Sequence, residues 1–299
     1  MTKKSKLLAV APDKVEPRKP KGLVFGPPGV GKTWVSLDFP GVYYVDTERG
    51  AERDHYRDKL KASGGVYFGP DQGSLDFDTV IGQVEALATE KHPYNTLVLD
   101  SGSKLFNNSI TEEQIRLGDK DAFGASKKQP VQKMGRLLRW INRIDMNVII
   151  ITHQKDLWGR DDKGNQTVIG QTFDCWDKLE YELDLVLRIS KIGSGESAIR
   201  QANIGKSRLT GFPENTKFDW SYAEFASRYG KDVIEREVVP VALASEEHVA
   251  EIKRLLDTVK VPEGIQDKWF TKYSVDSFEE MDAATILSLI EFVKGKIAQ

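Results

Sequence analysis

One segment decides the fold: Gly26-Pro27-Pro28-Gly29-Val30-Gly31-Lys32-Thr33. It matches the pattern G-x-x-x-x-G-K-[ST] at every fixed position. The apolar run Leu23 to Phe25 before it predicts a short buried strand, and a helix is predicted from about Lys32 to Asp38. Glycines in this setting let backbone N–H groups converge on a phosphate, and the helix start adds positive potential. The alternative, a chance glycine-rich turn, leaves the flanking strand and helix unexplained.

The segment predicts a binding site for ATP and Mg²⁺. We expect Lys32 to reach the β- and γ-phosphates and Thr33 to bind the metal. Asp100 closes the apolar strand Thr96 to Leu99, where a carboxylate holds Mg²⁺ through water in proteins with this loop. An aspartate at a strand end is otherwise common as a helix cap. Because Asp100 accompanies a complete phosphate loop, we assign it the metal role.

Strands and helices alternate after the loop. Apolar runs predict further strands, and helical spacing of apolar residues predicts helices between them. The predicted strands are 42–45, 96–99 and 147–152, and the predicted helices are 76–90 and 131–144. This order is typical of an α/β fold with a mostly parallel sheet covered by helices on both faces. After a polar loop at 160–170, runs at 183–189 and 198–204 predict antiparallel strands at the sheet edge.

The sequence predicts three parts. Residues 1–20 are rich in Lys and Pro and are expected to form a flexible basic arm, with order beginning at Gly22. Residues 21–240 carry the nucleotide site. Residues 245–299 repeat apolar side chains at helical spacing and predict a small helical domain. This last part is acidic, with eleven Asp or Glu against seven Lys or Arg.

Composition excludes several classes of protein. The chain of 299 residues has 39% hydrophobic and 29% charged residues, and no apolar run reaches the roughly 20 residues of a membrane span. We therefore expect a cytoplasmic protein, in the host cytoplasm if a phage encodes it. Cys175 is the single cysteine, and the four histidines lack ligand spacing, so no structural zinc is expected. The net charge of −2 means that any nucleic acid must bind to a local patch.

The catalytic carboxylate distinguishes two kinds of ATPase. The phosphate loop is similar to that of AAA+ machines, but these usually carry a Glu directly after the Asp that corresponds to Asp100, where this chain has Ser101. Glu48 follows the strand that ends near Asp46, and this arrangement resembles the strand-end glutamate of RecA-like recombinases. The resemblance implies that Glu48 polarises the attacking water. The alternative is a solvated carboxylate in an acidic turn.

Two later segments resemble RecA-like proteins in the same order. The run Ile149 to Gln154 resembles the strand that ends in a polar sensor, which implies that Gln154 feels the γ-phosphate; His153 beside it receives less weight. Lys206 and Arg208 resemble the Lys-x-Lys pair that reaches across a subunit interface to a neighbour's phosphates. Arg208 keeps the charge and adds a fork suited to phosphate oxygens. A basic strand end is the alternative.

Residues of about 20–240 thus resemble the phage-encoded family of compact RecA-like P-loop ATPases that act in single-strand annealing and recombination. The resemblance implies a RecA-like core, DNA-stimulated ATP hydrolysis, single-stranded DNA as partner and a homo-oligomer. The large amino-terminal oligomerisation helix of RecA has no counterpart here, so ring and filament both stay open. The last 55 residues resemble small helical tails of other phage recombination proteins and are a candidate module for a protein partner.

The resemblance places DNA-binding loops after the Asp100 strand and after the sensor strand. The candidate residues are Lys120, Phe123, Lys127 and Lys128 in the first loop, and Lys155, Trp158, Arg160 and Lys163 in the second. Each set combines cations for phosphates with an aromatic ring for base stacking. Solvated surface loops are the alternative. Arg136, Arg139 and Arg143 share a helical face, where either DNA contact or ordinary exposure fits.

Two other functions compete. A nucleotide-gated loader or scaffold would recruit replication or recombination proteins through the helical tail. A small-molecule kinase would use the same phosphate loop but needs an arginine-rich lid and an acceptor pocket, and the sequence identifies neither. The response of the ATPase rate to single-stranded DNA, a protein partner or a small acceptor distinguishes the three.

Overall fold

The computed structural model describes residues 11–12, 15–50, 54–195, 198–258, 262 and 264–297. Nine strands of this part form one sheet in the order β3-β2-β4-β5-β1-β7-β8-β9, with β6 paired to β5 outside this row. The strands are β1 (Lys21–Phe25), β2 (Val42–Asp46), β3 (Val66–Phe68), β4 (Thr96–Asp100), β5 (Asn147–Arg160), β6 (Gln166–Asp174), β7 (Leu185–Ile192), β8 (Ile199–Ser207) and β9 (Lys217–Asp219).

The strands from β3 to β7 in that row run parallel, and β8 and β9 continue the sheet antiparallel. β1 lies between β5 and β7, and β5 separates it from β4. The central strands are apolar on both faces, as in β4, where all five residues are buried. The prediction of a mostly parallel sheet with antiparallel strands at its edge is confirmed.

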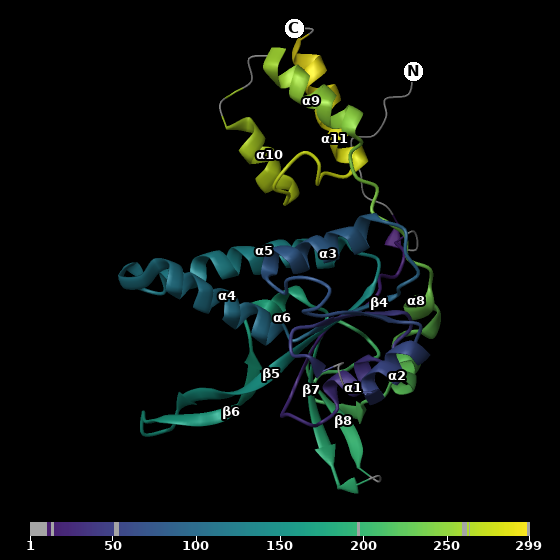
Figure 1. Cartoon of the computed structure of the whole chain (residues 1–299), viewed down its shortest axis with the longest axis vertical. Helices are drawn as coiled ribbons and strands as arrows, with labels where there is room; N and C mark the ends of the chain where they lie inside the picture. Colours follow the sequence, from purple (N-terminus) through teal and green to yellow (C-terminus); the bar gives the residue numbers. More distant parts are fainter. Residues whose placement is uncertain are drawn as a thin grey trace.

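Helices cover both faces of the sheet (Figure 1). One face carries α3 (Phe77–Thr89), α4 (Gly102–Leu117), α5 (Lys128–Arg143) and α6 (Leu179–Glu182). The other carries α1 (Lys32–Ser36), α2 (Asp54–Ala62), α7 (Tyr222–Tyr229) and α8 (Lys231–Glu235). Two short 3-10 turns, η3 (Gly118–Lys120) and η4 (Ala125–Lys127), connect α4 to α5. Each face has its own hydrophobic cluster.

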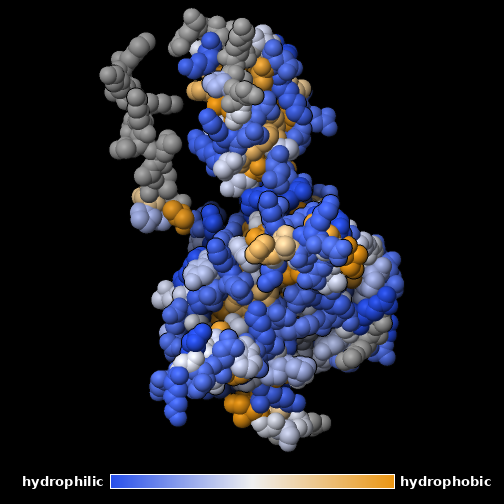
Figure 2. Space-filling view, turned by 90° about the vertical axis from the view of Figure 1, so that its left-hand side faces the viewer, coloured by the Kyte–Doolittle hydropathy of each residue, from blue (hydrophilic) through white to orange (hydrophobic). Residues whose placement is uncertain are grey.

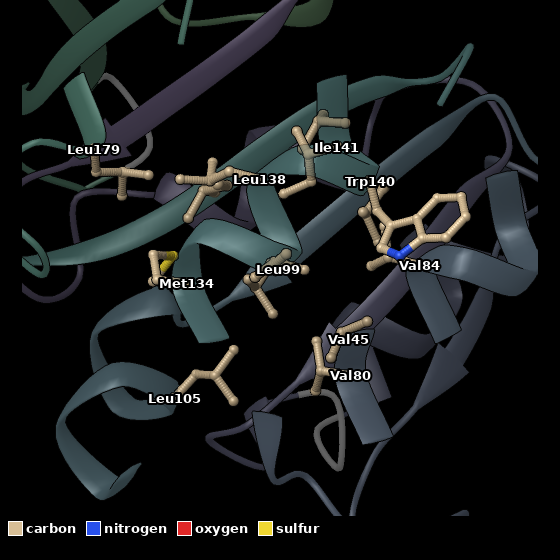
Figure 3. Packing of buried hydrophobic residues seen from close by; sticks show 14 of the residues in the cluster. Val45, Val80, Val84, Leu99, Leu105, Met134, Leu138, Trp140, Ile141 and Leu179 are labelled. Atoms are coloured by element: carbon tan, nitrogen blue, oxygen red, sulfur yellow. The ribbon is translucent and has the colours of Figure 1, made fainter. Parts of the chain in front are cut away.

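Local sequence signals set the helices on the first face. Asp76 caps α3 by accepting a hydrogen bond from the Thr79 backbone N–H at 2.8 Å, and Ser101 caps α4. Apolar residues then recur at helical spacing. Figure 3 shows Val80 of α3, Leu105 of α4 and Met134 of α5 around the β4 residue Leu99. The predicted helical spacing of 76–90 and 131–144 is thus confirmed.

The last three helices form a separate module. They are α9 (Glu246–Thr258), α10 (Ile265–Tyr273) and α11 (Ala283–Ile297). Their apolar faces make a hydrophobic cluster of their own, which includes Ile252, Trp269 and Ile286. In Figure 2 the module stands away from the sheet domain on a narrow neck. This agrees with the small helical domain predicted for 245–299.

The arginines of α5 bind the helical module. Arg136 and Arg139 each have an ion pair with Asp276, at 3.3 and 2.7 Å. Arg136 also reaches Glu280 at 2.8 Å, and Arg143 donates to the Glu280 backbone carbonyl at 2.7 Å. Of the two interpretations open from the sequence, neither DNA contact nor ordinary exposure describes this face, because the three side chains hold the two parts of the chain together.

Order begins earlier than predicted. Lys19 is 1% exposed, and its ammonium group donates to the Asn95 side chain at 3.2 Å and to the Arg236 carbonyl. Pro20 is also buried. The predicted start at Gly22 is therefore wrong by a few residues. Of the rest of the predicted arm, 11–12 and 15–18 are exposed, and 1–10 and 13–14 lie outside the described residues.

The predicted polar loop at 160–170 is also wrong in part. β5 does not end at Thr152 but continues to Arg160, and β6 returns from Gln166, so the segment is a hairpin with a short turn. In Figure 1 this hairpin projects beyond the body of the sheet. Among the described residues, none of the helices has the length and apolar character that a membrane crossing requires.

Candidate active site

The loop of Gly26 to Thr33 joins β1 to α1 at the carboxyl edge of the parallel strands. Two of its glycines have no room for a side chain. A Cβ atom on Gly26 would lie 2.4 Å from the Ile189 carbonyl oxygen, and one on Gly31 would lie 2.1 Å from the Nε of Arg200. Both also have positive φ angles, 152° and 91°, which disfavour other residues. At Gly26 the obstacle is backbone, so packing and conformation both require glycine. At Gly31 the obstacle is a flexible arginine side chain, so the positive φ angle is the stronger constraint.

Lys32 folds back over the loop. Its ammonium group donates to the carbonyl oxygens of Gly26 and Pro27 at 2.8 and 2.9 Å. Burial lowers the pKa of Lys32, while Asp100 and Glu48 oppose that shift. Both hydrogen bonds of the ammonium group stay within the loop, and its contact with phosphates stays a prediction.

Thr33 and Asp100 lie together. The Thr33 hydroxyl donates to the Asp100 carboxylate at 2.6 Å, and the Tyr44 hydroxyl donates to the same oxygen at 3.1 Å. Burial raises the pKa of Asp100 to about 6. A hydroxyl and a carboxylate side by side are the hard oxygen ligands that Mg²⁺ prefers, with waters and phosphates completing its shell. The pair fits the predicted metal role, and a bound Mg²⁺ there would neutralise phosphate charge.

Glu48 has two side-chain partners at this edge. Its Oε1 accepts from the Ser101 hydroxyl and from Nε2 of His153, both at 2.6 Å. Burial would raise the pKa of Glu48, but these two hydrogen bonds hold it below its ordinary value. Glu48 is therefore ionised at neutral pH, as a general base must be. Its role as base stays a prediction, and the structure gives His153 more weight than the sequence did.

Gln154 comes directly after His153 and faces the other side of the site. Its Oε1 accepts from Nε of Arg188 at 3.0 Å. Arg188 lies on β7, in register with Phe25 at the end of β1. The predicted sensor thus connects to a strand beside the phosphate loop, and the sensor role itself stays a prediction.

Lys206 and Arg208 lie elsewhere in their own chain. Lys206 pairs with Val186 near the start of β7, so both residues belong to the amino edge of the sheet, opposite the phosphate loop. Lys206 donates to the backbone carbonyls of Glu180, at 2.8 Å, and Leu183, and Arg208 donates to the carbonyl of Tyr181. Their action on a neighbouring subunit stays a prediction.

The candidate DNA residues form two groups. The second group, Lys155, Trp158, Arg160 and Lys163, lies on the β5–β6 hairpin, where Trp158 is 60% exposed. Lys155 lies 3.4 Å from Asp177 and 3.7 Å from Asp174, and Arg160 donates to the Gly164 carbonyl.

The first group, Lys120, Phe123, Lys127 and Lys128, surrounds the connection from α4 to α5. The Phe123 ring there is fully exposed. In Figure 1 this connection and the β5–β6 hairpin both extend to the left-hand side of the molecule. The structure therefore places the two groups on separate projections, and contact with DNA stays a prediction.

Sequence reasoning missed Arg188, Arg200 and Tyr44. The sequence contains a signal that could have identified Arg188, because this charged residue interrupts the apolar run of β7. Arg200 and Tyr44 had none, since their positions depend on pairing between strands that are distant in the chain.

Comparison with known families agrees with this geometry. The family model described as AAA domain (AAA_24) matches residues 18–210, which covers every strand from β1 to β8 and all predicted nucleotide-site residues. No curated protein matches the chain. Because the match spans more than half of the sequence and includes the complete phosphate loop, the chain belongs to the AAA domain family of P-loop NTPases.

Proposed function

We propose that this chain hydrolyses ATP and that single-stranded DNA, bound on the β5–β6 hairpin, controls the hydrolysis in recombination, annealing or strand exchange. One observation carries the proposal: β5 is a single strand that begins in the core of the sheet, passes the nucleotide site at His153 and ends at Arg160 on the projecting hairpin. A ligand on the hairpin therefore acts on the same strand that contacts Glu48.

The carboxyl edge has the parts that hydrolysis needs. Lys32 supplies positive charge for the phosphates, and Glu48 takes the proton of the water that attacks the γ-phosphorus. The bond to the leaving ADP oxygen then breaks. Positioning and electrostatic stabilisation account for most of the catalysis in phosphoryl transfer, and an ionised carboxylate held by Ser101 and His153 fits the water-orienting role.

The hairpin supplies suitable chemistry for single-stranded DNA. Trp158 offers an aromatic face, and base stacking on such a ring contributes about 1–3 kcal/mol per base with little sequence preference. Arg160 and Lys163 near the turn carry cations for the phosphate backbone. Of the two acidic residues in the turn, Asp161 is occupied locally, since it accepts hydrogen bonds from the backbone of Lys163 and Asn165.

The test measures ATP turnover with and without a single-stranded oligothymidine. We expect DNA to raise the rate of the wild-type protein and Trp158→Ala to remove most of that increase while the rate without DNA stays the same. Tyr181→Ala is the matched control, because Tyr181 is an aromatic side chain that is 65% exposed on α6, away from the hairpin. An ATPase that ignores single-stranded DNA contradicts the DNA part of the proposal and favours the loader function, in which only a protein partner stimulates turnover.

A further inference from the structure

An arginine from the β7–β8 hairpin rests on the phosphate loop. Arg200 lies near the start of β8, and a Cβ atom built on Gly31 would come within 2.1 Å of its Nε and 2.5 Å of its Cδ. Gly31 directly precedes Lys32. The absence of a side chain at Gly31 therefore lets the Arg200 stem lie against the loop that is built to hold phosphates.

Arg200 has no acceptor for its guanidinium group within the described residues. Its Nε is buried and lacks a hydrogen-bond partner there, and no ion pair joins it to a carboxylate in this part of the chain. The Nε atoms of Arg136 and Arg236 also lack a hydrogen bond, but both guanidinium groups have carboxylate partners at 2.8 Å through other nitrogens. Leaving a buried charged donor unpaired costs free energy, which an incoming acceptor recovers.

Backbone pairing fixes this position. Arg200 is in register with Lys191 of β7, and its carbonyl accepts from the Trp220 N–H at 2.7 Å. The same hairpin places the Ile189 carbonyl against Gly26. The hairpin thus packs against both constrained glycines of the loop, and strand pairing fixes the backbone position of Arg200.

We propose that Arg200 binds the phosphate chain of a nucleoside triphosphate, as a second cation beside Lys32 supplied by the same subunit. This inference rests on the proposed ATPase function and adds a residue to its site. A planar guanidinium forms two parallel hydrogen bonds to phosphate oxygens, which an ammonium group does not. The role differs from that predicted for Lys206 and Arg208, because Arg200 reaches the loop of its own chain.

Two substitutions separate charge from packing. Arg200→Met keeps an unbranched stem against Gly31 and removes the charge, whereas Arg200→Lys keeps both a stem and a charge. We expect Arg200→Met to weaken binding of a fluorescent ATP analogue by about 10- to 100-fold, the usual effect of losing a hydrogen bond to a charged group. Arg200→Lys should recover part of this loss. Lys191→Met is the matched control on the partner strand, exposed and paired in register with Arg200, and should bind as the wild type does.

The outcomes separate this inference from the proposed function. If wild-type protein binds the analogue and Lys32→Ala does not, the nucleotide site is real; wild-type affinity in Arg200→Met then overturns the role of Arg200 alone. If wild type and Lys32→Ala are equally unable to bind, both proposals fail. Thermal unfolding checks that each variant is folded, and Arg200→Gln replaces Arg200→Met if the latter does not fold.

A mixing experiment tests whether Arg200 acts within its own chain. Glu48→Gln and Arg200→Met each lack one part of the same site, so no subunit of a mixed assembly has a complete site. We expect no activity beyond the sum of the two proteins alone. Recovery of activity on mixing would show that Arg200 serves a neighbour, and the assignment to its own subunit would be wrong.

Discussion

Both edges of the sheet carry cations, but the two edges use them differently. On the amino edge the cations donate to backbone carbonyls of elements distant in the chain: Lys19 to Arg236, Lys21 to Ile144 and Met146, Lys206 to Glu180 and Leu183, and Arg208 to Tyr181. These bonds tie the ends of strands and helices together. These bonds leave few hydrogen-bond donors of each cation for a ligand.

On the carboxyl edge, among the described residues, the side chains of Lys32, Arg188 and Arg200 donate to no backbone carbonyl of another helix or strand. Lys32 donates to carbonyls of its own loop, five and six residues away. Arg188 donates to the side chain of Gln154, and the guanidinium of Arg200 rests on Gly31 with its Nε unpaired in the described part of the chain. Loop carbonyls, a side-chain amide or the lack of a partner leave these charges available to phosphates, as the proposed function requires. What a cation binds, rather than its presence, distinguishes the functional edge from the structural one.

The largest expected effect comes from Lys32→Ala. The substitution removes the charge that faces the β- and γ-phosphates, and contacts of this kind contribute about 1.5–3 kcal/mol each. We expect ATP affinity to fall by about 100-fold and turnover to be lost, with the unfolding temperature nearly unchanged because both hydrogen bonds of the side chain stay within its own loop. Titration with a fluorescent ATP analogue and a thermal melt measure the two. Normal turnover by folded Lys32→Ala would show that the carboxyl edge does not use this charge for ATP, and the contrast between the two edges would fail.

The double substitution Lys206→Ala with Arg208→Ala tests the structural edge. Both side chains hold carbonyls around α6, so we expect a loss of stability of about 1–2 kcal/mol, which lowers the unfolding temperature by a few degrees. ATP affinity per subunit should persist. Mixing this variant with Glu48→Gln tests the opposite role. Recovered ATPase activity would show that Lys206 and Arg208 serve a neighbouring subunit, as the resemblance to RecA implies. The amino edge would then be functional too.

The pH dependence of stability tests the structural role of Lys21 on the amino edge. Burial lowers the pKa of Lys21 to about 7, so between about pH 7 and 10 the unfolded chain binds more protons at this position than the folded protein. Stability rises with pH wherever the unfolded state binds more protons. The unfolding temperature of the wild type relative to Lys21→Met should therefore increase from pH 7 to 9. A constant difference across this range would show that Lys21 keeps its ordinary pKa in the fold.

The smallest effect is expected from removing residues 245–299. The helical module has its own hydrophobic cluster, and all predicted nucleotide-site residues precede it. The shortened chain should remain folded and bind ATP within about twofold of the full chain, because the ion pairs that join the module to α5 have modest energies. An insoluble or nucleotide-blind product would show that the module completes the ATPase domain.

The sequence predicts the parts of this fold that depend on local patterns. Apolar runs located β2, β4 and the start of β5, and the phosphate-loop pattern located the joint between β1 and α1. α2 and α4 were missed. Their apolar residues are few, since α2 buries only Leu60 among its described side chains and α4 carries several polar residues on its exposed face. The length of β5 was also missed, because half of it is a polar, exposed hairpin stabilised by β6 rather than by burial.

The candidate site likewise contains residues that local patterns predict and contacts that they do not. Lys32, Thr33 and Asp100 were predictable because motif and strand end fix them, and the structure brings Thr33 and Asp100 within 2.6 Å. The contact of His153 with Glu48, and that of Arg200 with Gly31, each join segments that lie far apart in the chain. Such contacts depend on the order of strands in the sheet, which a single sequence does not state.

The measurement that tests the central claim most directly is a single-turnover ATPase assay of Glu48→Gln. The amide keeps the shape of the side chain and loses the base, so the variant should bind ATP as the wild type does and hydrolyse it about 10²- to 10⁴-fold more slowly. Asp156→Asn, on the hairpin side of β5, is the control and should turn over normally without DNA. Wild-type hydrolysis by Glu48→Gln, with another carboxylate variant inactive, would contradict the assignment of the carboxyl edge as the hydrolytic site built around Glu48.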